Sequence, residues 1–236
     1  MDGTTKELEG GDGEFFDAIA HRYDLLNRVL SMGLDGRWRR RAIEALQIES
    51  PAKILDLATG TADLALAIAD SYPDAEVVGV DPSREMVAIG QQKAADAGHG
   101  DRIDLQLGDG QALGFDDDNF DGTAIAFGIR NFPDRLQGLR EMARVTRPGK
   151  PVVILELSEP DRGVMSGMAR FYVHQCVPRI GSLLSGSKEY RYLQESIAAF
   201  PSAERFVEMM EDAGLRDVTA QPLTFGVVNL YRGIAE

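Results

Sequence analysis

The chain has 236 residues, and 44% of them are hydrophobic, which suits one domain with a sizeable core better than two independent domains. Its net charge of −13 would repel phosphate backbones, so nucleic acid is excluded as an expected partner. The apolar runs are far too short to cross a bilayer and residues 1–7 lack a basic-then-apolar signal, so we expect a cytoplasmic protein.

The N-terminal section is expected to be helical. Residues 1–12 are rich in glycine and acidic side chains, and we expect a disordered tail there. Apolar spacing predicts helices at about 14–30 and 36–47, and the second helix carries a basic run at residues 37–41. We interpret residues 13–50 as the first part of a single domain that spans residues 13–236.

Residues 51–160 alternate between strand and helix patterns, which predicts a parallel sheet with helices on its faces. The expected helix near residue 84 opens at Pro82-Ser83, where Ser83 can cap it. The predicted elements are strands at 53–57, 76–80, 103–107, 120–126 and 152–157, and helices from 62, from 84 and at 134–145.

Residues 161–200 are interpreted as a helical cover over the substrate, and residues 201–236 as a closing helix and two strands. Between residues 162 and 191 basic side chains, including Arg170 and Arg179, dominate, and apolar residues recur at helical spacing. This segment is either a helix packed on the core or a face for a greasy substrate or a membrane surface. The closing helix is expected at 202–213, and the strands near 217–221 and 227–233.

A strand, a tight turn at Gly60, a helix, and an acidic residue at the end of the next strand open the sheet. In open sheets of this kind ligands lie beyond the carboxyl ends of the strands. Asp81 follows Gly60 by about twenty residues, a separation that places a carboxylate beside a ribose in dinucleotide folds. Asp109 and Gly110, at the end of the third strand, can contact an adenine edge.

The residues of the turn argue against a dinucleotide. The three glycine positions of the dinucleotide motif hold Gly60, Ala62 and Ala65, and Asp63 would repel a phosphate. S-adenosylmethionine has no phosphate and carries positive charge, so the acids Asp56, Asp63 and Asp81 suit it. An ordinary turn with solvated carboxylates is the alternative for this motif alone.

Several motifs, in order along the chain, resemble the quinone-biosynthesis C-methyltransferases, which methylate precursors of menaquinone and ubiquinone. The resemblance runs from about residue 15 to 233. It departs from the pattern at Leu26, where the family usually has methionine, and at Asp35, where it usually has histidine. The matching motifs are residues 23–27, 30–31, 127–132, 144–145, 148–149, 156–158, 178–181 and 190–197, together with Trp38.

The resemblance implies a class I S-adenosylmethionine-dependent methyltransferase fold, which is Rossmann-like, with a mostly parallel seven-stranded sheet, N-terminal helices and a helical insert. It implies S-adenosyl-L-methionine as cofactor, S-adenosyl-L-homocysteine as product and no metal. The cofactor contacts carry over to Thr61, Asp81, Asp109 and Gly110, beside Gly60 of the turn. A polyprenyl quinol is the implied substrate, and a homodimer and a peripheral contact with the inner face of the membrane are compatible with it.

Methylation of an aromatic carbon needs electron density that a quinol supplies when a neighbouring hydroxyl loses its proton. A fixed cation should therefore stabilise the phenolate, and we expect Arg130 to do so. A guanidinium with no lone pair to offer cannot be the base, so Asn131 and Tyr23 are expected to orient the ring or a water that takes the proton. The alternatives are a surface ion pair of Arg130 with Asp134, and a packing role for Tyr23.

The expected reaction is methylation of demethylmenaquinol to menaquinol. Methylation of 2-methoxy-6-polyprenyl-1,4-benzoquinol, and of another small molecule or a sterol, are the alternatives within the same enzyme class. An NAD-linked oxidoreductase is disfavoured by the missing glycines. A binding subunit without catalysis is disfavoured because it would not need Arg130 and Asn131.

Overall fold

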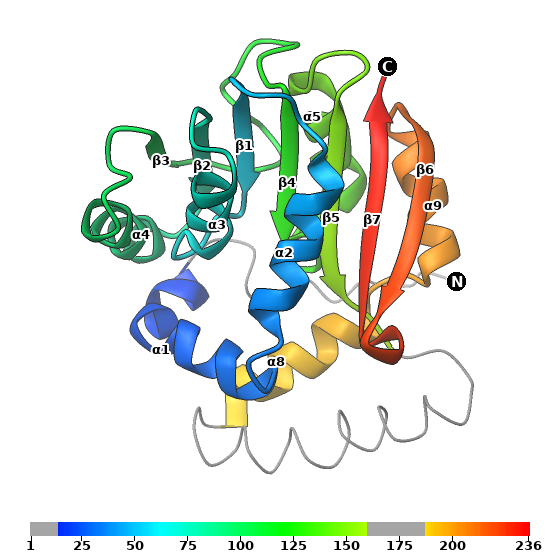
Figure 1. Cartoon of the computed structure of the whole chain (residues 1–236). Helices are drawn as coiled ribbons and strands as arrows, with labels where there is room; N and C mark the ends of the chain where they lie inside the picture. The colour runs from blue at the N-terminus through cyan, green and yellow to red at the C-terminus, as the bar shows by residue number, and fades with distance from the viewer. Residues whose placement is uncertain (1–13, 160–186) are drawn as a thin grey trace.

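The computed structural model describes residues 14–159 and 187–236, whose strands form one mostly parallel sheet (Figure 1). The strand order is β3-β2-β1-β4-β5-β7-β6. Strands β1 to β5 pair in parallel, whereas β7 runs antiparallel to both of its neighbours. The sheet confirms the predicted class. Its strands are β1 Lys53–Leu57, β2 Glu76–Asp81, β3 Ile103–Leu107, β4 Gly122–Ala126, β5 Pro151–Leu157, β6 Leu215–Leu223 and β7 Val228–Ala235.

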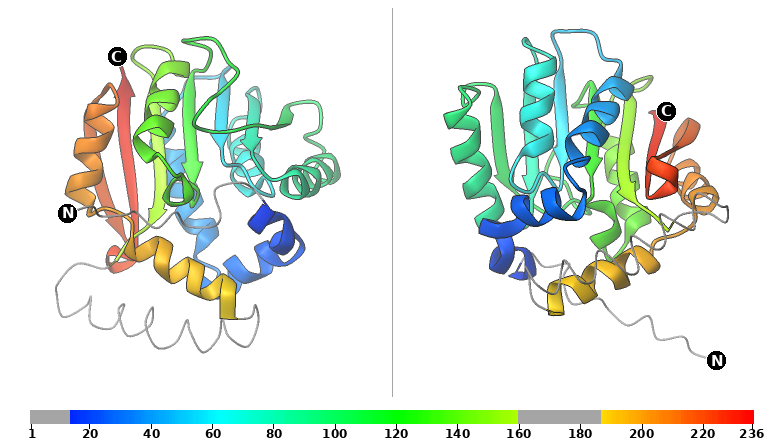
Figure 2. Two further views of the ribbon diagram at one scale, coloured as in Figure 1. Left: turned by 180° about the vertical axis from the view of Figure 1, so that it is seen from behind. Right: turned by 60° about the horizontal axis from the view of Figure 1, so that its bottom comes forward.

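Helices cover both faces of the sheet and create two separate cores (Figures 1 and 2). Side chains alternate along a strand, so Ile54 packs in one core while Leu55 and Leu57 pack in the other. Full burial of such a side chain contributes about 1.5–3 kcal/mol. One face carries α2 Asp35–Leu46, α3 Asp63–Ser71 and α4 Arg84–Asp96, and the other carries α5 Arg135–Val145 and α9 Ala203–Asp212.

Polar caps fix where the helices begin. The hydroxyl of Ser83 accepts the amide N–H of Met86, which confirms the predicted cap of α4. Asp134 caps α5 and Ser202 caps α9 in the same way, so each of these helices begins one residue after its predicted start. Gly214 follows α9 with a φ of +92°, a conformation that glycine adopts at low cost.

The starts of two strands, β4 and β6, differ most from the predicted ones. Strand β4 begins at Gly122, because Phe120 instead forms an isolated bridge with Thr146. Strand β6 begins at Leu215, and a register shift follows Arg216, where Asp217 adopts a φ of +53°. That irregularity is typical of a β-bulge, which breaks the alternation from which the strand was predicted.

Two helices lie across the end of the sheet where the parallel strands finish, namely α1 Glu14–Leu30 and α8 Ser187–Ala198 (Figures 1 and 2). Helix α1 packs on α4. The expected disordered tail at 1–12 and most of the expected cover at 161–200, including Arg170 and Arg179, lie outside the described residues. In the part of the chain that is described, the helices are too short or too polar to span a membrane.

Candidate active site

Asp81 joins the turn after β1 to the start of α4. Its Oδ2 accepts the amide N–H of Gly60 at 2.8 Å, and its Oδ1 accepts that of Ser83 at 2.9 Å. The side chain is buried, and this burial raises its pKa more than the two amide bonds lower it. Each carboxylate oxygen has a second lone pair, so Asp81 can still accept hydrogen bonds from a ligand diol.

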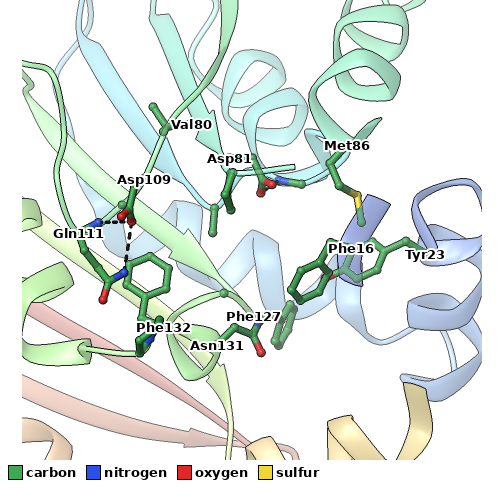
Figure 3. A pocket seen from close by; sticks show the side chains of 16 residues that line it. Phe16, Tyr23, Val80, Asp81, Met86, Asp109, Gln111, Phe127, Asn131 and Phe132 are labelled. Atoms are coloured by element: carbon green, nitrogen blue, oxygen red, sulfur yellow. Dashed lines mark hydrogen bonds between the residues drawn. The ribbon is translucent and has the colours of Figure 1, made fainter. Parts of the chain in front are cut away.

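A pocket opens beside Asp81 at the carboxyl ends of β1, β2 and β3, which we call the sheet-end pocket (Figure 3). A Cβ on Gly110 would lie 2.5 Å from the Phe132 ring, so a side chain there would displace that ring and narrow the pocket. Asp109 is exposed at the rim, where it accepts the amide N–H of Gln111 at 2.9 Å. The pocket is lined by Phe16, Tyr23, Ala58, Gly60, Val80, Asp81, Pro82, Met86, Asp109, Gly110, Gln111, Phe127, Gly128, Asn131, Phe132 and Pro133.

This lining fits S-adenosylmethionine. The walls combine apolar side chains such as Met86 and Phe132, which suit an adenine ring, with the carboxylates of Asp81 and Asp109, which suit a ribose diol and positive charge. Among the described residues, no group of three or more histidine, cysteine or acidic side chains could hold a metal ion.

Two acids expected to suit the cofactor lie elsewhere. Asp56 is 1% exposed and its Oδ2 accepts the hydroxyl of Thr59 at 2.6 Å. Burial raises the pKa of Asp56 to about 7. Asp63 pairs with Lys93 at 2.5 Å and with Arg39 at 3.4 Å. Neither acid lines the sheet-end pocket, because strand alternation turns Asp56 to the α2 side and Asp63, at the start of α3, faces α2 and α4.

Thr61 also lies outside the walls of the pocket. Its hydroxyl donates to Asp24 of α1 at 2.5 Å, and Lys93 reaches the same carboxylate at 2.9 Å. About two turns earlier on the same face of α1, Asp17 accepts the amide N–H of Glu85 at 3.1 Å. Helix α1 is thus held over the sheet-end pocket at two points, and a direct cofactor contact of Thr61 stays a prediction.

Two residues with positive φ shape the floor of the site. Ala58 follows β1 with a φ of +50°, and Phe127 follows β4 with a φ of +61°. Such conformations cost roughly 1–3 kcal/mol in residues other than glycine and cluster at functional sites. Phe127 lines the sheet-end pocket on one side and a second pocket on the other.

The second pocket is mostly apolar, and we call it the apolar pocket. Its walls come from the end of α1, the start of α2, helix α8 and the turn before β7. Trp38 forms one wall, and its indole N–H donates to the hydroxyl of Thr224 at 2.8 Å. The lining residues are Asn27, Leu30, Ser31, Met32, Leu34, Asp35, Trp38, Arg39, Phe127, Arg130, Leu157, Ser158, Leu193, Ile197, Thr224 and Val227.

Arg130 lies in η1 Ile129–Asn131 and borders the apolar pocket. It is 6% exposed, and its Nη1 lies 2.9 Å from Oε1 of Glu156. The alternative of a surface ion pair with Asp134 is therefore wrong, because Asp134 caps α5 and Arg130 is buried. Burial lowers the pKa of Arg130, but Glu156 and Tyr23 outweigh it and raise the pKa, so the guanidinium stays charged.

Asn131 lines the sheet-end pocket (Figure 3). Its Oδ1 accepts the hydroxyl of Tyr192 at 3.0 Å. Burial raises the pKa of Tyr192 more than Arg130 and Arg135 lower it, so this hydroxyl keeps its proton. With its oxygen engaged, the Asn131 amide can present N–H groups to the pocket. Tyr23 also lines this pocket, whereas Arg130, the third predicted catalytic residue, borders the adjoining apolar pocket.

Several residues of the site were not predicted. Phe16, Met86 and Phe132 line the sheet-end pocket, and Tyr192 and Glu156 hold Asn131 and Arg130. Tyr192 and Glu156 fall within the motifs of the resemblance, which could have drawn attention to them. Met86 and Phe16 give no signal in the sequence, because apolar residues on helices are normally core residues.

The sheet order, the carboxylate at the end of β2 and the pocket beside it define the class I methyltransferase fold. Solved structures share it. A putative S-adenosyl-L-methionine-dependent methyltransferase from Methanococcus maripaludis matches with a TM-score of 0.69 and 16% identity, over 100% of this chain and 97% of that one. An S-adenosylmethionine-dependent methyltransferase from Aquifex aeolicus matches with a TM-score of 0.68 and 15% identity, over 93% and 98%.

Sequence relatives give the family. A Geobacter sulfurreducens protein named ubiquinone/menaquinone biosynthesis C-methyltransferase is 44% identical over 93% of this chain and 86% of its own. A Thermus thermophilus demethylmenaquinone methyltransferase is 46% identical over 92% and 98%. The model of the ubiE/COQ5 methyltransferase family matches residues 5–235, and the chain belongs to this family. It is an S-adenosylmethionine-dependent C-methyltransferase.

Proposed function

We propose that the protein methylates a ring carbon of a reduced polyprenyl quinone precursor, and that this precursor is demethylmenaquinol. The observation that carries the proposal is the apolar pocket, which meets the sheet-end pocket at Phe127. Its apolar walls, which include Leu30, Leu193 and Val227, suit a hydrophobic tail. A wholly polar acceptor would lose its hydrogen bonds to water there without gaining partners from these walls.

The cofactor is proposed to bind in the sheet-end pocket. Asp81 accepts the ribose hydroxyls, Gly60 and Gly110 let the backbone approach, and Asp109 lies at the adenine side. Thr61 supports this arrangement by holding Asp24 of α1 over the turn. When bound, S-adenosylmethionine supplies an electrophilic methyl group.

The acceptor ring is proposed to lie at the junction of the two pockets. A phenol is mostly protonated at neutral pH, so the protein must stabilise the anion that forms on its oxygen. Asn131 supplies an N–H donor, and Tyr192 fixes its amide in that orientation. Tyr23 orients the ring or a water that removes the proton.

Arg130 contributes a fixed charge, but its effect is moderated. The carboxylate of Glu156 lies 2.9 Å from the guanidinium, so much of the positive field is cancelled at the acceptor. In return Glu156 holds the guanidinium in one place, because its second oxygen also accepts the backbone N–H of Arg130 at 3.1 Å. We therefore assign the direct contact with the phenolate to Asn131 and the supporting field to Arg130.

The names of the relatives favour the naphthoquinol as acceptor. The relatives from Thermus thermophilus and Deinococcus radiodurans, at 46% and 43% identity, are named demethylmenaquinone methyltransferases. The Geobacter relative carries both quinones in its name, so the benzoquinol is the second candidate.

The test offers radiolabelled S-adenosylmethionine with dithionite-reduced demethylmenaquinone, and separately with the reduced methoxylated benzoquinone analogue. Label should pass to the naphthoquinol and should depend on the reductant, because the oxidised quinone has no hydroxyl to deprotonate. Transfer to the benzoquinol alone would assign the second candidate. Transfer to neither would refute quinol methylation.

A further inference from the structure

The outer side of α2 carries a cluster of exposed arginines in a chain whose net charge is −13. Arg37, Arg40 and Arg41 border a shallow cleft beside Leu223 and Thr224. Arg39 in the same run is different, because it is buried and paired with Asp35 at 2.6 Å, whereas Arg41 pairs with Glu44 only at the exposed surface, at 2.9 Å. The exposed arginines are therefore not needed to hold the fold in the way that Arg39 is.

Two large apolar side chains are exposed beside this cluster. Met32 is 62% exposed and borders the apolar pocket, and Phe225 is 61% exposed at the tip of η3 Thr224–Gly226. Thr224 and Phe225 have φ values of +46° and +59°, which side chains with a Cβ rarely adopt. The Trp38 indole holds Thr224 through its hydroxyl. The turn thus adopts an unfavourable backbone conformation and leaves the aromatic ring of Phe225 exposed to water.

The arginines and the apolar side chains surround one opening. The cleft beside Arg37 and the apolar pocket share Leu34, Trp38 and Thr224 as walls, so they adjoin each other. The start of α2 and η3 also lie at the end of the sheet crossed by α1 and α8 (Figure 1). A hydrophobic substrate that enters the apolar pocket from this side must pass between positive charge and exposed apolar surface.

We propose that Met32, Phe225, Arg37, Arg40 and Arg41 form a docking face for an anionic lipid surface, from which the hydrophobic acceptor enters the apolar pocket. The role in substrate entry rests on the quinol substrate proposed above, whereas binding of the face to lipid does not depend on that substrate. Charges more than about 8–10 Å away are screened at physiological salt, so the local arginines and not the net charge of the chain govern contact. Met32 and Phe225 insert at the headgroup boundary while the arginines bind phosphates.

The experiment measures co-sedimentation of the full chain with two kinds of vesicle, pure phosphatidylcholine and an equal mixture with phosphatidylglycerol. The unaltered protein should bind the anionic vesicles and not the neutral ones. Each basic residue near such a surface contributes about fivefold in partitioning, so Arg37→Glu with Arg40→Glu should lose about thirtyfold or more. Phe225→Ser should lose about tenfold, because an aromatic side chain no longer leaves water.

The matched control is Arg140→Glu with Arg216→Glu, which changes the net charge equally on exposed positions of α5 and β6. This control should lose less than about threefold. The proposal is overturned if the unaltered protein ignores anionic vesicles, if the Arg37 and Arg40 variant binds as well as the unaltered protein, or if the control loses as much.

A second measurement separates this proposal from the proposed function. Methyl transfer to a short-tailed, water-soluble quinol should be unchanged in the Arg37 and Arg40 variant, whereas transfer to a polyprenyl quinol held in anionic vesicles should fall with vesicle binding. No transfer to either quinol by the unaltered protein, with vesicle binding intact, would refute the reaction and leave the docking face standing. Equal transfer from vesicles by both proteins would refute the role of the face in substrate entry.

Discussion

The sheet-end pocket and the apolar pocket meet at Phe127 but are built in different ways. The sheet-end pocket is anchored by backbone bonds, with Asp81 accepting the N–H groups of Gly60 and Ser83 from two consecutive connections of the parallel sheet. The apolar pocket is formed mainly by side chains of helices and turns. Two ion pairs among the described residues border it, Arg39 with the partly buried Asp35 and Arg130 with the fully buried Glu156.

Because of this difference, we expect single substitutions to act differently in the two pockets. In the sheet-end pocket the proposed ligand contact is the anchored carboxylate of Asp81, so a change there should alter ligand affinity. In the apolar pocket many weak contacts add up, so most single changes should be tolerated, and only the buried pair beneath it is sensitive. The predictions below test this division, from the largest expected effect to the smallest.

Arg130→Ala should cost about 3–5 kcal/mol of unfolding free energy, because it leaves the fully buried carboxyl group of Glu156 without its partner. Denaturant unfolding measures this. The double variant Arg130→Met with Glu156→Gln should regain most of the loss, because no unpaired charge remains. The control Arg205→Ala, which breaks a surface pair with Glu208, should change stability by less than about 1 kcal/mol. Equal losses for the two single variants would show that Arg130 is not buried in solution.

Asp56 should make the protein less stable as the pH rises. Its folded pKa is about 7, whereas an unfolded aspartate titrates near 3.9, so between these values the folded state binds the extra proton. Asp56→Asn keeps an acceptor for Thr59 and carries no charge. It should match the unaltered protein near pH 4 and exceed it near pH 8 by up to about 4 kcal/mol in unfolding free energy.

Denaturant midpoints at the two pH values provide the measurement. The exposed Asp104→Asn on β3 serves as control, and the pH should change its stability difference little. If Asp56→Asn behaves like this control, Asp56 is ionised in the folded protein and its burial does not set its pKa. Asp56 does not line the sheet-end pocket, so cofactor affinity should hardly change in either variant.

Much of the sheet-end pocket could be predicted because its signals are local. The alternation of strands and helices is visible in short windows, with Asp81 at the end of β2 and with Gly60 and Gly110 in the short turns after β1 and β3. A parallel sheet brings such positions to one edge by its topology alone. Asp56 was misplaced because it lies within β1, where strand alternation turns its side chain to the α2 face of the sheet and not into the pocket.

The apolar pocket could not be predicted in this way. Leu30, Trp38, Leu193 and Val227 lie far apart in the sequence, and each reads as an ordinary core residue. The ion pair of the buried Arg130 in η1 likewise involves Glu156 of β5, and only the pairing of β4 with β5 brings these two residues together. Such residues come together only in the tertiary structure, which local sequence patterns do not reveal. The motifs of the family resemblance pointed to some of them.

Asn131→Ala should lower kcat by about a hundredfold while cofactor affinity stays within a few-fold, because the donor matters only once charge forms on the acceptor oxygen. Asn131→Asp should be at least as harmful, since it places a negative charge there. Tyr192→Phe should cost about tenfold or less, because the Asn131 amide remains but is no longer fixed by the hydroxyl. Steady-state kinetics with titrated cofactor measures all three. Near-normal turnover in Asn131→Ala would remove it from the reaction.

Asp81→Ala should weaken binding of S-adenosylhomocysteine by more than about tenfold, because charge-assisted hydrogen bonds contribute roughly 1.5–3 kcal/mol each. Its pKa is raised by burial, so affinity of the unaltered protein should fall on acidification at a higher pH than an exposed aspartate would give. Asp81→Asn keeps one oxygen acceptor and should lose less affinity and also lose this pH dependence. Titration calorimetry across pH measures both effects. Asp109→Asn at the exposed rim should change affinity less than either variant, and unchanged affinity in Asp81→Ala would show that the sheet-end pocket does not depend on its anchor.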